Sequence, residues 1–145
     1  MNTSTTEQLD SAIVIAVNAH AGVINKDLTP YILHPIRLMQ QAETNDEKIV
    51  AILHDTVEDT YVTLVDLKDK MFPQHIVDAV DALSKRVGET YEDAIERIAL
   101  NPLATKIKLL DLYDNIDVTR LPVLGDWELK RTAKYHKAIL RLRSV

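Results

Sequence analysis

Apolar residues recur along most of the chain at intervals of three and four residues, which is the spacing of one face of an α-helix. In the first such segment, residues 7–19, Leu9 and Ile13 fall on the same side, and Thr5 or Thr6 stands where an N-cap is expected. Only 3 Gly and 5 Pro leave little turn chemistry for a set of β-hairpins. The pattern therefore predicts an all-α protein.

Helix breakers and caps divide the rest of the chain into further helices, with a loop expected over residues 25–31. The other predicted helices span residues 32–41, 45–57, 63–72, 73–85, 91–100, 102–118 and 126–143. A chain of 145 residues with 46% hydrophobic residues has enough apolar material for one sizeable core. We expect a single domain over residues 1–145, built as a helical bundle of about seven to eight helices.

Composition narrows the chemistry that this bundle can carry. Cysteine is absent, which excludes disulfides, thiolate metal sites and a cysteine nucleophile. The formal net charge of -5 argues against nucleic acid or an anionic membrane as the main partner. Residues 1–10 are polar rather than signal-like, and no apolar run approaches the roughly 20 residues of a membrane span. We therefore expect a cytoplasmic protein that binds neither nucleic acid nor membrane.

The most informative segment follows the apolar run of residues 49–53. It places His54 and Asp55 side by side, with Glu58 and Asp59 one helical turn later. Burying an imidazole and three carboxylates beside apolar residues is costly unless a partner satisfies them, and a bound dication is such a partner. For an isolated His-Asp pair, a capping cluster of solvated acids is the alternative interpretation.

Two further segments supply more ligands of the same type. His34 lies at the start of a predicted helix, and Lys108, Asp111 and Asn115 share one stripe of another at positions i, i+3 and i+7. A site of two His and two Asp leaves positions open for water and substrate. Mixed imidazole and carboxylate ligation suits Mn, Fe, Co, Ni or Zn rather than Ca.

In order and spacing, these segments resemble the hydrolase domain of the RelA/SpoT alarmone enzymes, and more closely the stand-alone small alarmone hydrolases of the HD superfamily. The resemblance covers about residues 16–121. The matching motifs are Ala19-His20-Ala21-Gly22 with Pro30-Tyr31-Ile32-Leu33-His34-Pro35, then Leu53-His54-Asp55 with Glu58-Asp59-Thr60, and last Lys108-Leu109-Leu110-Asp111 with Asn115.

The resemblance implies a metal-dependent phosphohydrolase that removes pyrophosphate from the 3′ position of a purine nucleotide of the ppGpp or ppApp type. It further implies one manganese ion, with Glu58 and Asp59 positioning or activating the attacking water. The implied metal ligands are His34, His54, Asp55 and Asp111. The chemistry is consistent, because a dication lowers the pKa of its bound water and a carboxylate one turn away is well placed as a general base.

The chain departs from the family pattern in two places. In residues 23–26 only Lys26 matches the family's basic loop, and Asn25 stands where the family has an arginine that packs on the base, so adenine and guanine both remain open. The third motif reads Asp-Leu-Tyr-Asp-Asn over residues 111–115 where the family has Asp-Arg-Leu-His-Asn, which removes a cation and an imidazole. The candidate substrate contacts are Lys26, Tyr31, Lys85, Lys108 and Asn115.

Two other functions remain as alternatives. One keeps the site but acts on another nucleotide, such as NADPH or a nucleoside monophosphate. The other is a non-catalytic nucleotide-binding or regulatory HD module, against which the retained Glu58 and Asp59 argue. The apolar positions of the last helix either close the core or form a homo-oligomer seam. We interpret Tyr91, Trp127 and Tyr135 as packing residues of their helices.

Overall fold

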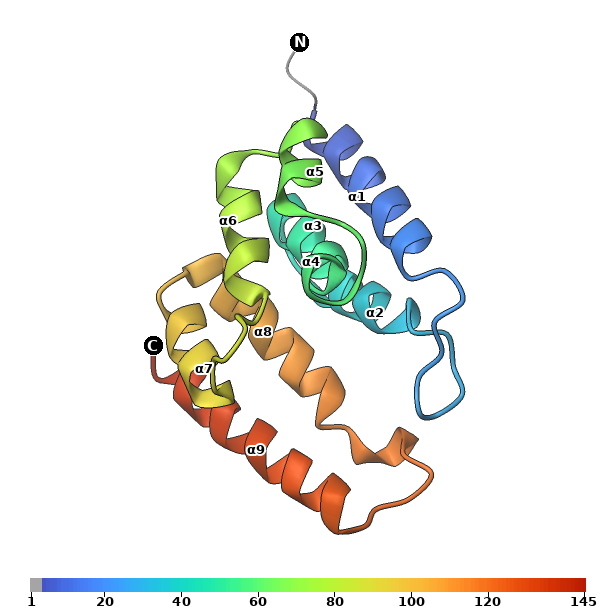
Figure 1. Cartoon of the computed structure of the whole chain (residues 1–145), viewed down its shortest axis with the longest axis vertical. Helices are drawn as coiled ribbons and strands as arrows, with labels where there is room; N and C mark the ends of the chain where they lie inside the picture. The colour runs from blue at the N-terminus through green and yellow to red at the C-terminus, as the bar shows by residue number, and fades with distance from the viewer. Residues whose placement is uncertain (1–3) are drawn as a thin grey trace.

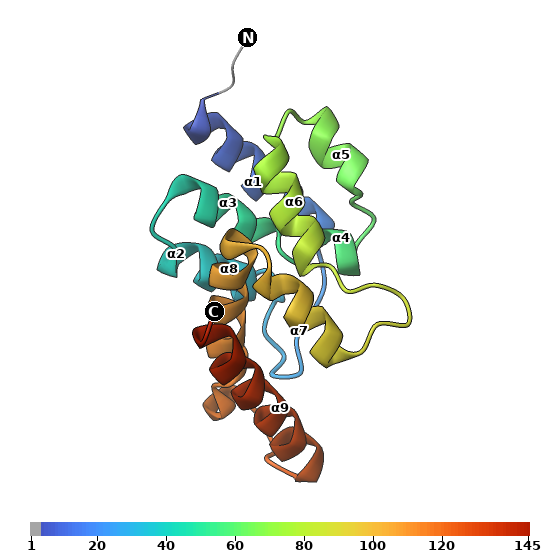
Figure 2. The ribbon, with the colours of Figure 1, turned by 90° about the vertical axis from the view of Figure 1, so that its left-hand side faces the viewer.

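The computed structural model describes residues 4–145, so residues 1–3 of the polar N-terminal segment lie outside the described part. The described chain forms nine α-helices, one 3-10 helix and no β-strand, which confirms the predicted all-α bundle (Figures 1 and 2). In chain order the elements are α1 (Thr5–Ala19), α2 (Leu33–Gln41), α3 (Asn45–Leu53), α4 (Thr56–Asp59), α5 (Leu64–Asp69), α6 (Gln74–Leu83), α7 (Tyr91–Ala99), α8 (Pro102–Asn115), η1 (Val118–Arg120) and α9 (Asp126–Arg143).

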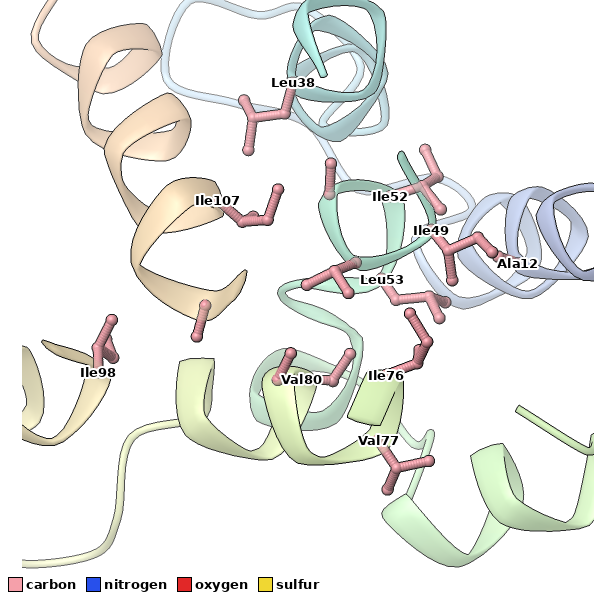
Figure 3. Close-up of a cluster of buried hydrophobic side chains, with 14 of the residues drawn as sticks. Ala12, Leu38, Ile49, Ile52, Leu53, Ile76, Val77, Val80, Ile98 and Ile107 are labelled. Atoms are coloured by element: carbon pink, nitrogen blue, oxygen red, sulfur yellow. The ribbon is translucent and has the colours of Figure 1, made fainter. Parts of the chain in front are cut away.

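Helix α3 is the centre of the bundle. It packs against α1, α2, α6 and α8, and residues 49–53 are all completely buried. Figure 3 shows its apolar side chains surrounded by those of the neighbouring helices. Those neighbours include Ala12 from α1, Leu38 from α2, Ile76 from α6 and Ile107 from α8. A helix that is covered on all sides needs apolar residues around its whole circumference, which residues 49–53 supply.

The predicted helix over residues 45–57 is wrong in one respect, because it breaks at His54 and Asp55 into α3 and α4. The ring Nδ1 of His54 donates to the carbonyl of Ala51 at 2.8 Å, and the hydroxyl of Thr56 donates to the carbonyl of Leu53 at 2.8 Å. In a continuous helix these carbonyls would accept from backbone N–H groups four residues later. Side-chain donors that compete for backbone carbonyls favour such a break.

The last two α-helices lie side by side and run in opposite directions (Figure 1). The predicted helix 102–118 ends earlier, at Asn115, and the chain continues into η1, whereas α9 spans the predicted residues 126–143. One face of α9 closes the core with Ile139 and Leu142, while Leu129 and Leu140 are exposed. Homo-oligomerisation through that exposed face stays a prediction. No helix within residues 4–145 has both the length and the apolar character needed to cross a membrane.

The turn between α6 and α7 is fixed by one arginine of α7. The guanidinium of Arg97 donates to the carbonyls of Ala82 and Ser84, at 2.6 and 3.1 Å, and to the carboxylate of Glu89 at 2.8 Å. Glu89 also accepts from the backbone N–H of Arg86. The bond from Arg97, followed by the one from Arg86, lowers the pKa of Glu89 from 4.5 to about 2. Its ionised form therefore holds this turn together.

We expect Glu89→Gln to flatten the acid side of the stability profile. Because the pKa of Glu89 is lowered in the folded state, its contribution is fully present above pH 4.5 and is lost as the pH falls toward about 2. Urea unfolding between about pH 5 and pH 3 should therefore show a smaller loss of unfolding free energy in the variant than in the wild type. Glu92→Gln, at an exposed acid in the first turn of α7, is the control. Identical pH slopes for wild type and Glu89→Gln would contradict this expectation.

Candidate active site

Three buried side chains from three helices converge beside the core. His34 lies in the first turn of α2, His54 follows the last residue of α3, and Asp111 lies within α8. One nitrogen or oxygen atom of each lies within 4.8 Å of the others. The Nε2 atom of His34 is 2.9 Å and that of His54 is 3.6 Å from the same Asp111 oxygen. The fold thus brings together three of the four side chains that the sequence predicts as metal ligands.

The environment of His54 fits a cation. Its Nδ1–H donates to Ala51, so its Nε2 presents a lone pair, and this buried atom has no hydrogen-bond partner. It faces carboxylate oxygens of Asp55 at 3.1 Å and Asp111 at 3.6 Å. Groups that all accept and do not donate repel one another unless a cation lies among them. The donor set of imidazole nitrogen and carboxylate oxygen therefore suits a divalent cation.

The fourth predicted ligand, Asp55, joins this cluster to a second group of carboxylates. Oxygens of Asp55, Glu58 and Asp59 lie within 4.8 Å of one another. Burial first, and then the negative charge of Asp111, raise the pKa of Asp55 well above its ordinary value. Burial opposes ionisation of Asp111 too, but the Lys108 ammonium at 2.8 Å and the imidazoles outweigh it and hold its pKa well below the ordinary value. Glu58 and Asp59 are exposed, but Asp55 lies next to the buried Asp111, and negative charge concentrated at that point favours a dication.

The two carboxylates predicted to act on water lie on the short helix α4. Burial, followed by the charge of Glu58, raises the pKa of Asp59 above its ordinary value. Glu58 is held in place from the α6–α7 turn, because the backbone N–H of Lys85 donates to its Oε1 at 2.6 Å. The turn that Arg97 fixes is therefore in direct contact with a candidate catalytic side chain.

These groups open into a cleft of about 370 Å³. The predicted site residues that line it are Lys26, Tyr31, His34, Asp55, Glu58, Asp59, Lys108, Asp111 and Asn115. Lys85 is not among the lining residues, and its recorded contact is the main-chain bond to Glu58. Two of the predicted substrate contacts already bind Asp111, through the Lys108 ammonium and through the Asn115 amide at 2.7 Å.

One wall of the cleft comes from helices that sequence reasoning did not connect with the site. Arg131, Lys134 and Tyr135 of α9 and Tyr91 of α7 all line it. The interpretation of the two tyrosines as packing residues was incomplete, because they pack against the core and also face the cleft. Their signal in the sequence is the i, i+3, i+4 spacing of the α9 residues, which predicts a shared face. The sequence does not say which way that face points.

Sequence comparison relates the chain to a pyrophosphohydrolase and a pyrophosphokinase of guanosine nucleotides, although no protein-family model matches it. It is 29% identical over 140 residues to guanosine-3′,5′-bis(diphosphate) 3′-pyrophosphohydrolase of Aquifex aeolicus, covering 88% of this chain and 20% of that protein. It is 32% identical over 121 residues to a probable GTP pyrophosphokinase of Mycobacterium leprae, covering 75% of this chain and 15% of that protein. The solved structure of a metazoan ortholog of SpoT that hydrolyses ppGpp shares the fold, with a TM-score of 0.82 and 22% identity over 98% of this chain and 89% of that one.

The chain belongs to the RelA/SpoT HD domains. Because it spans only 20% and 15% of the two full-length relatives, and because their names describe different reactions, those names do not by themselves assign an activity to this HD domain.

This HD domain has its own support for the first histidine. Nδ1 of His34 donates to Asp114 at 2.6 Å, and Asp114 accepts two further bonds from Arg37 at 2.8 and 2.9 Å. Burial opposes ionisation of Asp114, but the bonds from His34 and Arg37 prevail and lower its pKa. Asp114 stands where the family pattern has histidine, so the departure supplies a carboxylate that orients His34. Sequence reasoning missed this role, which the i+3 spacings of Arg37 from His34 and of Asp114 from Asp111 could have suggested.

We expect Asp114→Asn to weaken binding of Mn²⁺. A neutral amide no longer compensates Arg37 and holds the imidazole of His34 less firmly, and loss of such an orienting carboxylate typically costs about 10- to 100-fold in metal affinity. Calorimetric titration with Mn²⁺ measures the dissociation constant directly, and circular dichroism verifies the fold. Asp117→Asn is the matched control, since Asp117 lines the same cleft but is exposed and caps η1. A folded Asp114→Asn variant with wild-type Mn²⁺ affinity would show that Asp114 does not support the site.

Proposed function

We propose that this chain is a divalent-metal-dependent phosphohydrolase that releases pyrophosphate from the 3′ position of an alarmone-like purine nucleotide. The observation that carries the proposal is the convergence of His34, His54 and Asp111 on one point, directly beside three clustered carboxylates in a cleft lined by both carboxylates and cations. The relatives of this HD domain support it, since one of them is named for removal of that 3′-pyrophosphate.

His34, His54, Asp55 and Asp111 would hold the ion, which we propose to be Mn²⁺. Such a donor set agrees with a preference for Mn, Fe, Co, Ni or Zn over Ca. When bound, the ion lowers the pKa of water and neutralises phosphate charge. The protein's part is to fix the ligands: Asp114 orients His34, and the carbonyl of Ala51 fixes the tautomer of His54.

Glu58 and Asp59 would act on the attacking water. The oxygen of water forms a bond to the phosphorus nearest the ribose, and the bond from that phosphorus to the 3′-oxygen breaks. A proton from the water passes to one of the two carboxylates, and the departing 3′-oxygen takes up a proton, so that ppGpp and water give GDP and pyrophosphate. The raised pKa of Asp59 makes its ionised carboxylate a better proton acceptor than an ordinary aspartate.

The far end of the cleft would receive the remainder of the nucleotide. Its wall carries cations from the loop after α1 and from α9, which suits a substrate with several phosphate charges. Asn25 lines this wall in the place of the family's base-packing arginine. We therefore propose an alarmone substrate and test both purine bases.

The deciding experiment measures product release from ppGpp, ppApp and NADPH, with Mn²⁺ and with EDTA. We expect pyrophosphate from at least one alarmone, dependent on metal, and its loss in the His54→Ala, Asp55→Ala variant. Removal of the proton acceptors in Glu58→Gln, Asp59→Asn should lower kcat by about 10²- to 10⁴-fold while leaving Mn²⁺ binding intact.

Asp69→Asn, at an exposed acid on α5, is the control and should retain wild-type turnover. Orthophosphate released from NADPH, without turnover of either alarmone, would replace the proposed substrate. Unchanged turnover in the Glu58, Asp59 double variant would overturn the proposed mechanism.

A further inference from the structure

The cations that line the cleft are held in two different ways. Arg37, Lys108 and Arg120 each form ion pairs with aspartates, at 2.8 Å for the first two and 3.1 Å for Arg120 with Asp117. Lys26, Arg131 and Lys134 instead lie over aromatic rings, and within residues 4–145 no ion pair is recorded for them. The first set is already compensated by the protein. The charges of Lys26, Arg131 and Lys134 therefore remain available to an anion that binds in the cleft.

The rings and the second set of cations alternate along the rim of the cleft. Lys26 Nζ lies 3.4 Å from the centre of the Trp127 ring, and the guanidinium carbon of Arg131 lies 5.2 Å from the same ring. Arg131 is also 5.5 Å from the ring of Tyr135, and Lys134 Nζ lies 4.5 Å from that of Tyr91. An aromatic face attracts a cation through its quadrupole and does not neutralise it.

Trp127 differs from the other rings in its position. It lies in the first turn of α9, is 54% exposed and is not a lining residue of the cleft, so its interpretation as a packing residue was wrong. Its contact with Lys26 ties the loop after α1 to α9, two segments far apart in the sequence. Trp127 thus contacts Lys26 and Arg131, which both line the cleft, although Trp127 itself does not line it.

We propose that Trp127 is a positioning residue for substrate binding: its ring holds Lys26 and Arg131 at the rim of the cleft, where they bind phosphate groups of the nucleotide that lie away from the metal ligands. This inference rests on the proposed function, since it assigns a role within the same site. The ligand is a polyphosphate anion, and its binding depends on a residue outside the cleft lining.

The acidity of the cleft explains why such a holder is needed. The lining residues include seven carboxylates, among them Asp27 immediately next to Lys26. A flexible lysine in this setting would form an ion pair with a carboxylate, and its charge would then no longer be available to the substrate. The indole ring competes with those carboxylates for the ammonium group of Lys26. A phosphate group carries net negative charge, which the ring does not, so it attracts the ammonium group more strongly and draws it into the cleft.

The test compares Trp127→Leu and Trp127→Phe with the wild type in steady-state hydrolysis of ppGpp and ppApp. We expect Trp127→Leu to raise KM by about three- to tenfold, with kcat within about twofold, because the ring affects binding and not the chemical step. Trp127→Phe keeps a smaller aromatic face and should give an intermediate KM. Leu129→Ala, at an equally exposed apolar residue of the same helix, is the control and should keep the wild-type KM.

A double-mutant cycle separates positioning from a general structural effect. In a Lys26→Met background the Trp127→Leu change should have a smaller effect on KM than in the wild type, since one of the two cations that the ring holds is gone. Thermal unfolding of each variant monitors the fold. Equal and independent effects of the two substitutions, a wild-type KM in Trp127→Leu, or a lowered KM would each overturn the proposal.

Equilibrium binding of ppGpp keeps this test separate from that of the proposed function. If the wild type binds ppGpp but hydrolyses neither ppGpp nor ppApp, the proposed function fails, and the ratio of Kd for ppGpp between Trp127→Leu and wild type still tests Trp127. A ratio of one overturns the positioning role. If the wild type binds none of ppGpp, ppApp and inorganic pyrophosphate, both proposals are overturned.

Discussion

The buried end of α3 puts polar groups where water does not reach, and the rest of the site follows from how the protein satisfies them. Because α3 passes through the middle of the bundle, its last turn cannot turn away to solvent. The carbonyls that it leaves there are taken by the side chains of His54 and Thr56, and this breaks the helix. The break frees Asp55 from the helical register and starts α4 with Glu58 and Asp59 close by. One local competition for hydrogen bonds thereby orders both halves of the candidate site.

The electrostatics of the site follow from the same burial. Desolvation alone would protonate these carboxyl groups, and the protein counters it unevenly. Asp111 and Asp114 receive cationic or imidazole donors and stay ionised, whereas Asp55 and Asp59 receive little compensation and have raised pKa values. The cluster therefore combines firmly ionised carboxylates with carboxyl groups that take up a proton more readily.

The outer part of the cleft follows a different physical rule. If carboxylates of the protein paired with all of the cations there, few would be left to bind a substrate. Because carboxylates lie close by, such pairing would occur unless another group held the cations. Rings of Trp127, Tyr135 and Tyr91 hold three of them without cancelling their charge. An acidic chain of net charge -5 thus keeps cations available along one wall of the cleft, as the proposed anionic substrate would need.

The sequence by itself determined whatever depends on neighbours a few residues away. Helical periodicity and helix breakers predicted the helices, including the limits of α9, because apolar spacing and turn residues act within one or two turns. The motifs around His34, His54 and Asp111 likewise indicated which residue types are available as candidate metal ligands, because each motif spans only a few neighbouring residues.

Only the tertiary structure decided which side chains meet. It broke the predicted helix at His54, made Asp114 the partner of His34 from across the bundle, and kept Lys85 out of the cleft lining. It also turned one face of α9 toward the site. These outcomes depend on the packing of helices remote in sequence, and a local pattern defines a helix face without fixing the direction in which packing turns it.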